Sequence, residues 1–122
     1  MRKEKYFLDT SFLLDLMKEK KEAVKIHRKI KGDEFTGTPC LYELSKFAQF
    51  DVYEFLKNNE VLKFGPKDAK IAGKIYQKLA KKGQLIGEID IIIAGMVSNR
   101  KFTLVTRDKD FEKIEKIKIK NY

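Results

Sequence analysis

The sequence has 122 residues, 43% of them hydrophobic and nine of them phenylalanine, which indicates a folded chain rather than a disordered one. Lys and Arg number 27 against 18 Asp and Glu, and the net charge of +9 favours a polyanion such as nucleic acid as partner. A mixed-charge surface, as in heat-adapted proteins, would explain part of this composition. The longest uncharged apolar stretch, 91–97, is too short to cross a membrane, and the single cysteine excludes an internal disulfide. A cytoplasmic protein without a membrane segment is expected.

The first predicted element is a short strand, Tyr6–Leu8, which ends on the carboxylate of Asp9 before a helical apolar pattern begins at Phe12. In an open parallel sheet, ligands bind beyond the carboxyl ends of the strands, so Asp9 is a candidate site residue. The same carboxylate could instead cap the following helix by accepting a backbone N–H. The local sequence is compatible with both interpretations.

An amphipathic helix is predicted over residues 20–31, ended by Gly32, and a short strand over residues 34–37. His27, the only histidine, stands beside the apolar stripe of this helix without a cysteine or a second histidine nearby. It is interpreted as a residue of the helix surface or the core edge. A histidine-based metal site is therefore excluded.

The next predicted helix has Thr38 as its N-cap and Pro39 at the first helical position. Glu43 lies one turn into this helix. An acid that complements the positive end of the helix dipole is a sufficient explanation for Glu43 taken alone. Its position also allows it to join a site formed with acids from other elements.

Helix continues or restarts over residues 51–57 and is broken by the Asn58-Asn59 pair. Another strand is expected over residues 61–64. It is followed by a strongly amphipathic helix over residues 66–82, whose apolar residues repeat at spacings of three and four.

The run 89–97 is apolar and rich in β-branched residues, a pattern that buried strands and buried helices share. A buried helix is predicted, because a clear strand over residues 102–106 follows too closely for another strand to fit. Asp90 stands at the mouth of this helix, either as a cap or first-turn acid or as a site residue. Asp108 follows the strand in the way that Asp9 follows the first one.

A last edge strand is predicted over residues 114–119, where isoleucine and lysine alternate towards its end. Strand and helix patterns alternate along the chain, so the predicted fold class is α/β, with a central, mainly parallel sheet of four to five strands flanked by helices. No linker, internal repeat or low-complexity segment divides the chain, which predicts a single domain over residues 1–122.

Four acids are expected to converge at one edge of this sheet. Asp9 and Asp108 both follow strands, and Asp90 and Glu43 are expected in the first turns of helices that begin at the same edge. Clustered carboxylates repel one another unless a cation lies between them, and oxygen ligands without histidine or cysteine suit Mg²⁺ or Mn²⁺. An acidic metal pocket in a basic protein is typical of an enzyme that cleaves phosphodiester bonds.

The motifs resemble the PIN-domain family, with the order and size of the compact ribonuclease toxins of VapBC-type toxin–antitoxin pairs. The similar segments are F-L-D-T-S at 7–11, Glu43 in a helix opened by proline, D-I-I-I-A at 90–94 and L-V-T-R-D-K-D-F at 104–111. The resemblance spans nearly the whole chain; the first and last motifs are its most specific parts, whereas Glu43 matches by position. It implies a metal-dependent endoribonuclease.

By this resemblance, the catalytic acids are Asp9, Glu43, Asp90 and Asp108. Mg²⁺ or Mn²⁺ bound by the three aspartates would activate water and neutralise the scissile phosphate, and Glu43 would complete the metal shell or hold the attacking water. Glu88 is a weaker competitor of Asp90. Ser11 or Thr106 would orient a ligand or water, and Asp110 would support or replace Asp108.

The resemblance also implies partners: an RNA substrate, a second copy of the chain, and a cognate antitoxin whose arginine reaches towards Asp9 and Asp90. Phe12 and Tyr76 are candidates for the dimer surface or for core. Two alternatives remain, a non-catalytic basic α/β module that binds RNA or protein, and a PIN nuclease of rRNA processing or RNA decay. A receiver domain is disfavoured, because Asp51 follows a helical pattern, and so is a haloacid-dehalogenase-type phosphatase, because position 11 is serine.

Overall fold

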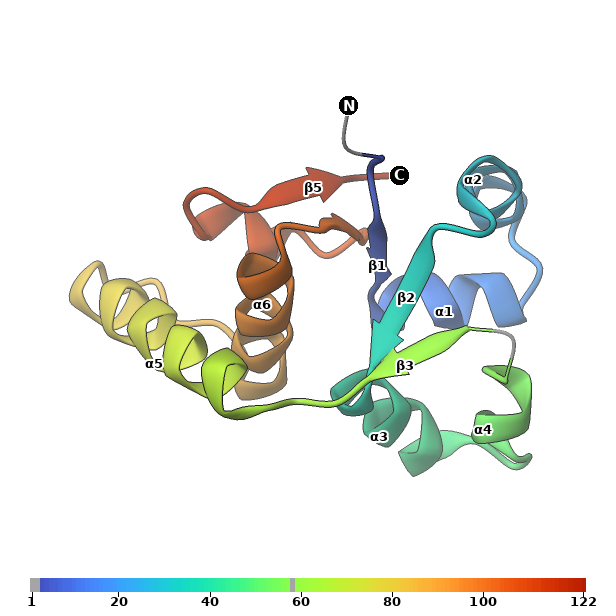
Figure 1. Ribbon diagram of the computed structural model, residues 1–122, viewed down its shortest axis with the longest axis horizontal. Helices are drawn as coiled ribbons and strands as arrows, with labels where there is room; N and C mark the ends of the chain where they lie inside the picture. Colours follow the sequence, from blue (N-terminus) through green and yellow to red (C-terminus); the bar gives the residue numbers. More distant parts are fainter. Residues whose placement is uncertain (1–2, 58) are drawn as a thin grey trace.

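Five short parallel strands form the central sheet of the computed structural model, which describes residues 3–57 and 59–122. Their order across the sheet is β3-β2-β1-β4-β5. The chain first builds one half of the sheet and then returns to place β4 beside β1, so the strand order reverses between these two strands (Figure 1). The strands are β1 (Tyr6–Leu8), β2 (Glu34–Gly37), β3 (Glu60–Leu62), β4 (Thr103–Val105) and β5 (Lys118–Lys120). The predicted α/β class with a parallel sheet is confirmed.

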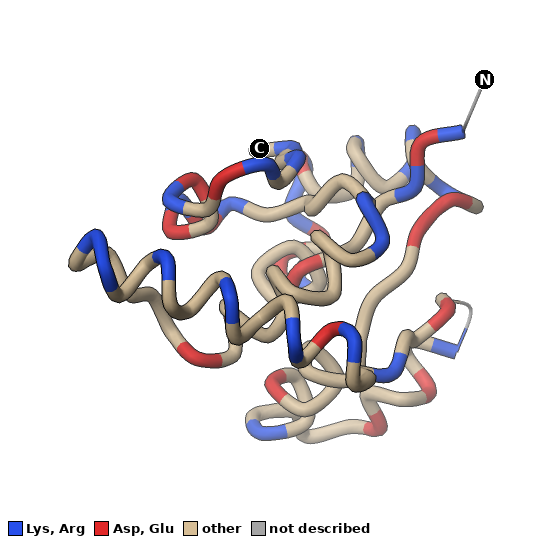
Figure 2. Tube along the Cα trace, turned by 60° about the vertical axis from the view of Figure 1, so that its left-hand side comes forward, with Lys and Arg blue, Asp and Glu red and all other residues tan. Residues whose placement is uncertain are grey.

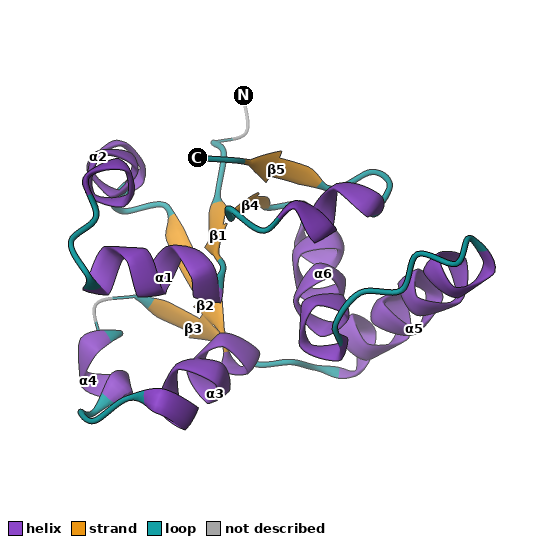
Figure 3. Ribbon diagram, turned by 180° about the vertical axis from the view of Figure 1, so that it is seen from behind, coloured by secondary structure: helices purple, strands orange, loops and turns teal. Residues whose placement is uncertain are grey.

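Helices cover both faces of this sheet. Those that connect β1 to β3 lie on one face, and those between β3 and β4 lie on the other (Figures 1 and 3), as right-handed crossovers require. None of the described helices is long and apolar enough to cross a membrane. The helices are α1 (Thr10–Met17), α2 (Lys21–Ile30), α3 (Thr38–Phe47), α4 (Val52–Phe55), α5 (Pro66–Lys81), α6 (Glu88–Arg100) and the 3₁₀ helix η1 (Lys109–Lys113).

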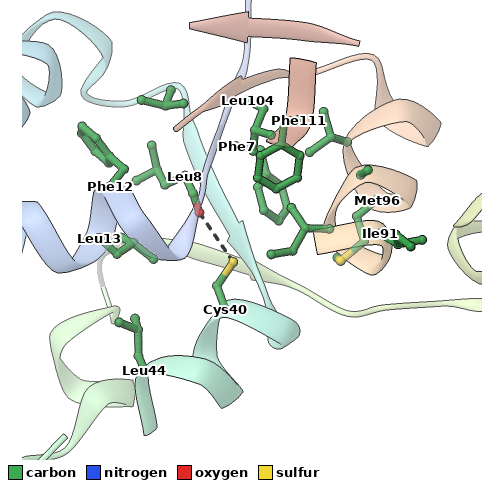
Figure 4. Packing of buried hydrophobic residues seen from close by; sticks show 14 of the residues in the cluster. Phe7, Leu8, Phe12, Leu13, Cys40, Leu44, Ile91, Met96, Leu104 and Phe111 are labelled. Atoms are coloured by element: carbon green, nitrogen blue, oxygen red, sulfur yellow. Dashed lines mark hydrogen bonds between the residues drawn. The ribbon is translucent and has the colours of Figure 1, made fainter. Parts of the chain in front are cut away.

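The core lies between the central strands and their flanking helices (Figure 4). Phe7 and Leu104, on neighbouring strands, are completely buried, as expected of parallel strands covered on both faces. Met96 of α6 and Phe111 of η1 are equally buried. The apolar run 89–97 is therefore the buried helix that the sequence predicts.

A buried carboxylate joins α5 to α6. Asp68 is 2% exposed and accepts hydrogen bonds from Asn99 Nδ2 at 2.8 Å and Arg100 Nη1 at 2.7 Å, while the Gly65 N–H donates to its other oxygen at 2.9 Å. Gly95 lets the two helices approach, because a Cβ atom there would lie 2.7 Å from the Asp68 carbonyl oxygen. This tie fixes α6, and with α6 the residue Asp90 at its beginning.

Several predicted element boundaries differ from the observed ones; the strand predicted over residues 61–64, for example, is β3 over Glu60–Leu62. Gly37 is the N-cap of α3, while Thr38 lies inside the helix and its hydroxyl accepts the Phe64 N–H at 3.3 Å. The last strand is limited to 118–120, because the preceding segment turns through η1 and directs Ile114 into the core. Asn58, part of the predicted helix break, lies outside the described residues.

Basic and acidic residues are interspersed along the whole chain (Figure 2). Basic residues outnumber acidic ones by nine. An anionic partner is therefore attracted by the protein as a whole, although the carboxyl edge of the sheet carries a cluster of acids.

Candidate active site

The candidate site lies beyond the carboxyl ends of β1 and β4, where the strand order reverses. Asp9 directly follows β1, and its N–H donates to the Val105 carbonyl oxygen of β4 at 3.1 Å. Asp9 is 3% exposed, and its Oδ2 accepts hydrogen bonds from Ser11 Oγ at 2.9 Å and Thr106 Oγ1 at 2.7 Å. Asp9 occupies the N-cap position of α1, but its side chain makes no capping hydrogen bond to that helix, so capping does not account for this carboxylate.

Burial makes the charged form of Asp9 costly. It raises the pKa of this carboxyl above its ordinary value, although hydrogen bonds from Thr106, Ser11 and the Thr10 backbone oppose the effect and the charge of Glu43 adds to it. Ser11 and Thr106, predicted to orient a ligand or water, hold the carboxylate of Asp9 in this structure.

Three other carboxylates face one another beside Asp9. Asp90, Asp108 and Asp110 each offer an oxygen within 4.8 Å of the others. Asp90 lies in the first turn of α6, as predicted. Glu88, the weaker candidate, is exposed on the same turn and outside this group.

The electrostatic centre of the site is Asp90. Burial, followed by the negative charges of Asp9, Asp108 and Glu43, raises the pKa of Asp90 to about 7. Asp90 therefore interacts electrostatically with the other three acids predicted from the sequence. A pKa shift of this size at a half-buried acid is typical of functional sites.

Asp108 belongs to a tightly bonded turn after β4. Its N–H donates to Thr106 Oγ1 at 3.0 Å, and its Oδ1 accepts the Asp110 N–H at 2.9 Å, which caps η1. Asp108 is therefore both a cap and a member of the acid group. Its Oδ1 fixes the turn by accepting the Asp110 N–H, and the same carboxylate belongs to the group formed with Asp90 and Asp110.

Glu43 reaches the site from α3. It lies in the second turn of that helix rather than the first, so it is not the dipole-complementing acid of the simpler interpretation. Thr10 Oγ1 donates to Glu43 Oε1 at 2.6 Å, which joins the beginning of α1 to α3 beside Asp9. Glu43 is half-buried.

The donor set fits a hard divalent cation. The group offers carboxylate oxygens only. The only histidine, His27, is on α2, where its Nε2 lies 3.0 Å from Oε2 of Glu34. Burial raises the pKa of Asp90 most, and the negative charges of Asp9, Asp108 and Glu43 raise it further; a cation bound here would offset those charges. Asp110 belongs to the group of acids whose oxygens all lie within 4.8 Å of one another, and Asp9 does not.

Residues other than the predicted set also build this site. Thr10 lies in the motif F-L-D-T-S, but no sequence pattern connects it with Glu43, because the two residues are brought together by the packing of α1 and α3. Asp15 interrupts the apolar face of α1 and is 2% exposed. It forms an ion pair with Arg107, the residue that separates Thr106 from Asp108 in the sequence. In the sequence, a charged residue on the apolar face of a helix indicates that such a buried ion pair is needed.

Comparison with known proteins places these features in a family. The PIN-domain model matches residues 6–117. The chain is 28% identical to Ribonuclease VapC2 of Haemophilus influenzae and 28% identical to the tRNA(fMet)-specific endonuclease VapC of Salmonella typhimurium, covering 97% of this chain and 98% of each relative.

The fold is similar as well. A solved structure of DNA-bound VapBC from Salmonella typhimurium matches with a TM-score of 0.86 and 25% identity over 98% of both chains. The family model, the order of motifs and the acidic edge between β1 and β4 agree. The chain belongs to the PIN-domain family.

Proposed function

We propose that the protein is a VapC-like endoribonuclease, the toxin of a toxin–antitoxin pair, which cleaves RNA phosphodiester bonds with Mg²⁺ or Mn²⁺. The observation that carries this proposal is the acid cluster at the strand-order reversal, where burial, together with the negative charges of the neighbouring acids, raises the pKa of Asp90 to about 7. The similarity to VapC ribonucleases over nearly the whole chain supports the choice of RNA as substrate.

Asp9, Asp90 and Asp108 are the proposed metal ligands, and Asp110 is close enough to Asp90 and Asp108 to support them. A bound Mg²⁺ or Mn²⁺ would supply a water of lowered pKa and neutralise charge on the scissile phosphate. Glu43, held by Thr10 at 2.6 Å, is positioned to orient the attacking water by accepting a hydrogen bond from it.

The side chains around Asp9 keep its carboxylate in one orientation. Ser11 and Thr106 both donate to the same oxygen, and Thr106 also accepts from the Asp108 N–H. Two of the proposed ligands are thus connected through one hydroxyl. This preorganisation leaves little rotation to be lost when a cation binds.

We propose two protein partners, a second copy of the chain and a cognate antitoxin. An antitoxin arginine reaching Asp9 and Asp90 would bond their carboxylates through its two-pronged guanidinium and compete with the metal. We expect the protein to act in the cytoplasm, where a free buried thiol such as that of Cys40 remains reduced.

The decisive experiment is a cleavage assay on single-stranded RNA with Mg²⁺ or Mn²⁺, repeated with excess chelator and with a DNA strand of the same sequence. We expect cleavage of RNA with metal and none with chelator. Binding of RNA without cleavage under every metal condition would support a non-catalytic binding module instead. Tight binding of the antitoxin without loss of cleavage would show that it does not cover the acid cluster.

A further inference from the structure

Arg107 lies in the middle of the turn that carries the site. It stands between Thr106, which holds Asp9, and Asp108 of the acid group. Its N–H donates to Ser11 Oγ at 3.4 Å, and its Nε lies 2.8 Å from Asp15 Oδ2. Backbone and side chain are therefore both tied to α1.

The partner of Arg107 is an uncommon carboxylate. Asp15 is 2% exposed, and its Oδ1 finds no hydrogen-bond partner among the described residues. The hydroxyl of Tyr122 donates to Oδ2 at 2.8 Å, and Lys20 Nζ lies 3.7 Å from Oδ1. The ring of Tyr122 also packs edge-on against Phe12 at 5.4 Å, which fixes its hydroxyl in place.

This carboxylate stays charged. Burial raises the pKa of Asp15, but the Tyr122 hydroxyl and the positive charges of Arg107 and Lys20 outweigh burial and hold the pKa below its ordinary value. A buried charge is costly unless partners hold it, so Asp15 and Arg107 constrain each other strongly. The guanidinium is therefore fixed at its Nε end.

The outer end of Arg107 is free to bind a ligand. Its side chain is 51% exposed, and within the described residues its two Nη groups make no hydrogen bond. A guanidinium held at Nε presents these donors in a fixed plane, which is the geometry that matches phosphate oxygens. Next to an acid cluster that repels RNA, a fixed cation of this kind compensates the repulsion.

We propose that Arg107 is a phosphate-binding residue, which holds a phosphate of the RNA backbone next to the acid cluster, with Asp15 and Tyr122 as positioning residues. This inference rests on the proposed ribonuclease function. It adds a cationic contact to a site otherwise described by its acids. It also gives the buried carboxylate of Asp15 a role, which is to hold the guanidinium of Arg107 in place.

The test compares Arg107→Gln with Arg28→Gln, which removes the same charge from the exposed face of α2. Cleavage of a single-stranded oligoribonucleotide is measured in Mg²⁺ or Mn²⁺ at several concentrations of monovalent salt. We expect Arg107→Gln to raise KM about tenfold with a much smaller change in kcat. The slope of log(kcat/KM) against log salt should become shallower by about 0.7, the value for one phosphate contact on a single strand.

The control should keep the wild-type KM within about twofold and the wild-type salt slope, because one distant surface charge makes no phosphate contact. Loss of kcat in Arg107→Gln with unchanged KM and salt slope would overturn the proposal, since a purely structural role predicts that pattern. If Arg107→Gln does not fold, Arg107→Lys carries the test. It should keep the salt slope but raise KM, because lysine cannot bond Asp15 and phosphate together.

The two levels of inference fail separately. If the wild-type protein binds RNA but cleaves none with either metal, the proposed function is wrong and the inference that rests on it is overturned with it. If the wild type cleaves RNA and both arginine variants behave alike, only the role of Arg107 is wrong.

Discussion

At the scale of single residues, Asp9 is the most constrained acid of the site. Its Oδ2 accepts bonds from Ser11 and Thr106, and an asparagine oxygen could accept both. We expect Asp9→Asn to lower cleavage by a factor on the order of 100 or more, because a metal ligand loses its charge. Thermal unfolding in the absence of metal should occur at or above the wild-type temperature, since the raised pKa of Asp9 means that its buried charge opposes folding.

Two results would contradict this expectation. Wild-type cleavage by Asp9→Asn would remove Asp9 from the ligand set. A large drop in the unfolding temperature would show that the charge itself holds the fold. Asp51→Asn is a matched control, because Asp51 caps the short helix α4 by accepting the Glu54 N–H at 3.2 Å and lies outside the acid group.

Asp90 makes stability and metal binding depend on pH. Its pKa of about 7 in the folded state exceeds the ordinary 3.8, so between these pH values the folded protein binds more protons than the unfolded one. Stability without metal therefore falls as pH rises through this window. Metal requires the deprotonated acid, so the rise in unfolding temperature caused by Mg²⁺ or Mn²⁺ should be larger at pH 8 than at pH 5.5.

Thermal unfolding with millimolar metal and with chelator at both pH values measures this difference. Asp90→Asn is the control, and in this variant the metal-dependent gain should be small at both pH values. An unfolding temperature that is indifferent to metal at pH 8 would count against a carboxylate metal site as a whole.

At the scale of elements, the close packing of α5 on α6 positions Asp90. A Cβ on Gly95 would lie 2.8 Å from Ala72 Cβ and 2.7 Å from the Asp68 carbonyl oxygen, so the helices would have to separate. We expect Gly95→Ala to destabilise the protein by about 1–3 kcal/mol through overpacking. Cleavage should fall as well, because α6 carries Asp90.

The same helix pair contains a control. Gly73 of α5 is exposed, and a Cβ there would meet nothing within 4 Å. Gly73→Ala should therefore stabilise the protein by roughly 0.5–1 kcal/mol, the helix-propensity difference between the two residues. Urea unfolding of both variants measures the two effects, and equal stability changes would refute the packing argument.

At the scale of the whole molecule, the exposed aromatic side chains of α3, α4 and the segment between them give the protein an apolar surface that a monomer leaves in water. Of the two residues first considered, Phe12 is completely buried, so it is core, while Tyr76 is 41% exposed. The exposed aromatic residues of this surface are Tyr42, Phe47, Phe50, Tyr53 and Phe55.

We expect a homodimer that uses this surface. Light scattering should give about twice the chain mass of 14.3 kDa at high concentration, where mass action favours association. Phe47→Ser, at a position 75% exposed, should weaken the dimer without lowering stability, because the ring has little to lose within the monomer. A particle of single-chain mass at every concentration would exclude the dimer.

The sequence by itself determined the fold class and indicated which acids lie near one another at the edge of the sheet. Alternating strand and helix patterns follow from local periodicity, which depends on neighbouring residues only. For the same reason, the sequence predicts that strands end before Asp9 and Asp108 and that a helix begins near Asp90. The family resemblance rests on the motifs that contain these residues. The α/β class and the PIN family are confirmed.

Only the tertiary structure decided how these acids meet. The Thr10 hydroxyl bonds Glu43 across 33 residues of sequence, Tyr122 reaches Asp15 across 107, and Thr106 reaches Asp9 across 97. Local periodicity contains no information on such pairs, because strand order and helix packing bring them together. The same holds for the charge balance that raises the pKa of Asp90, since it sums burial and charges from separate elements.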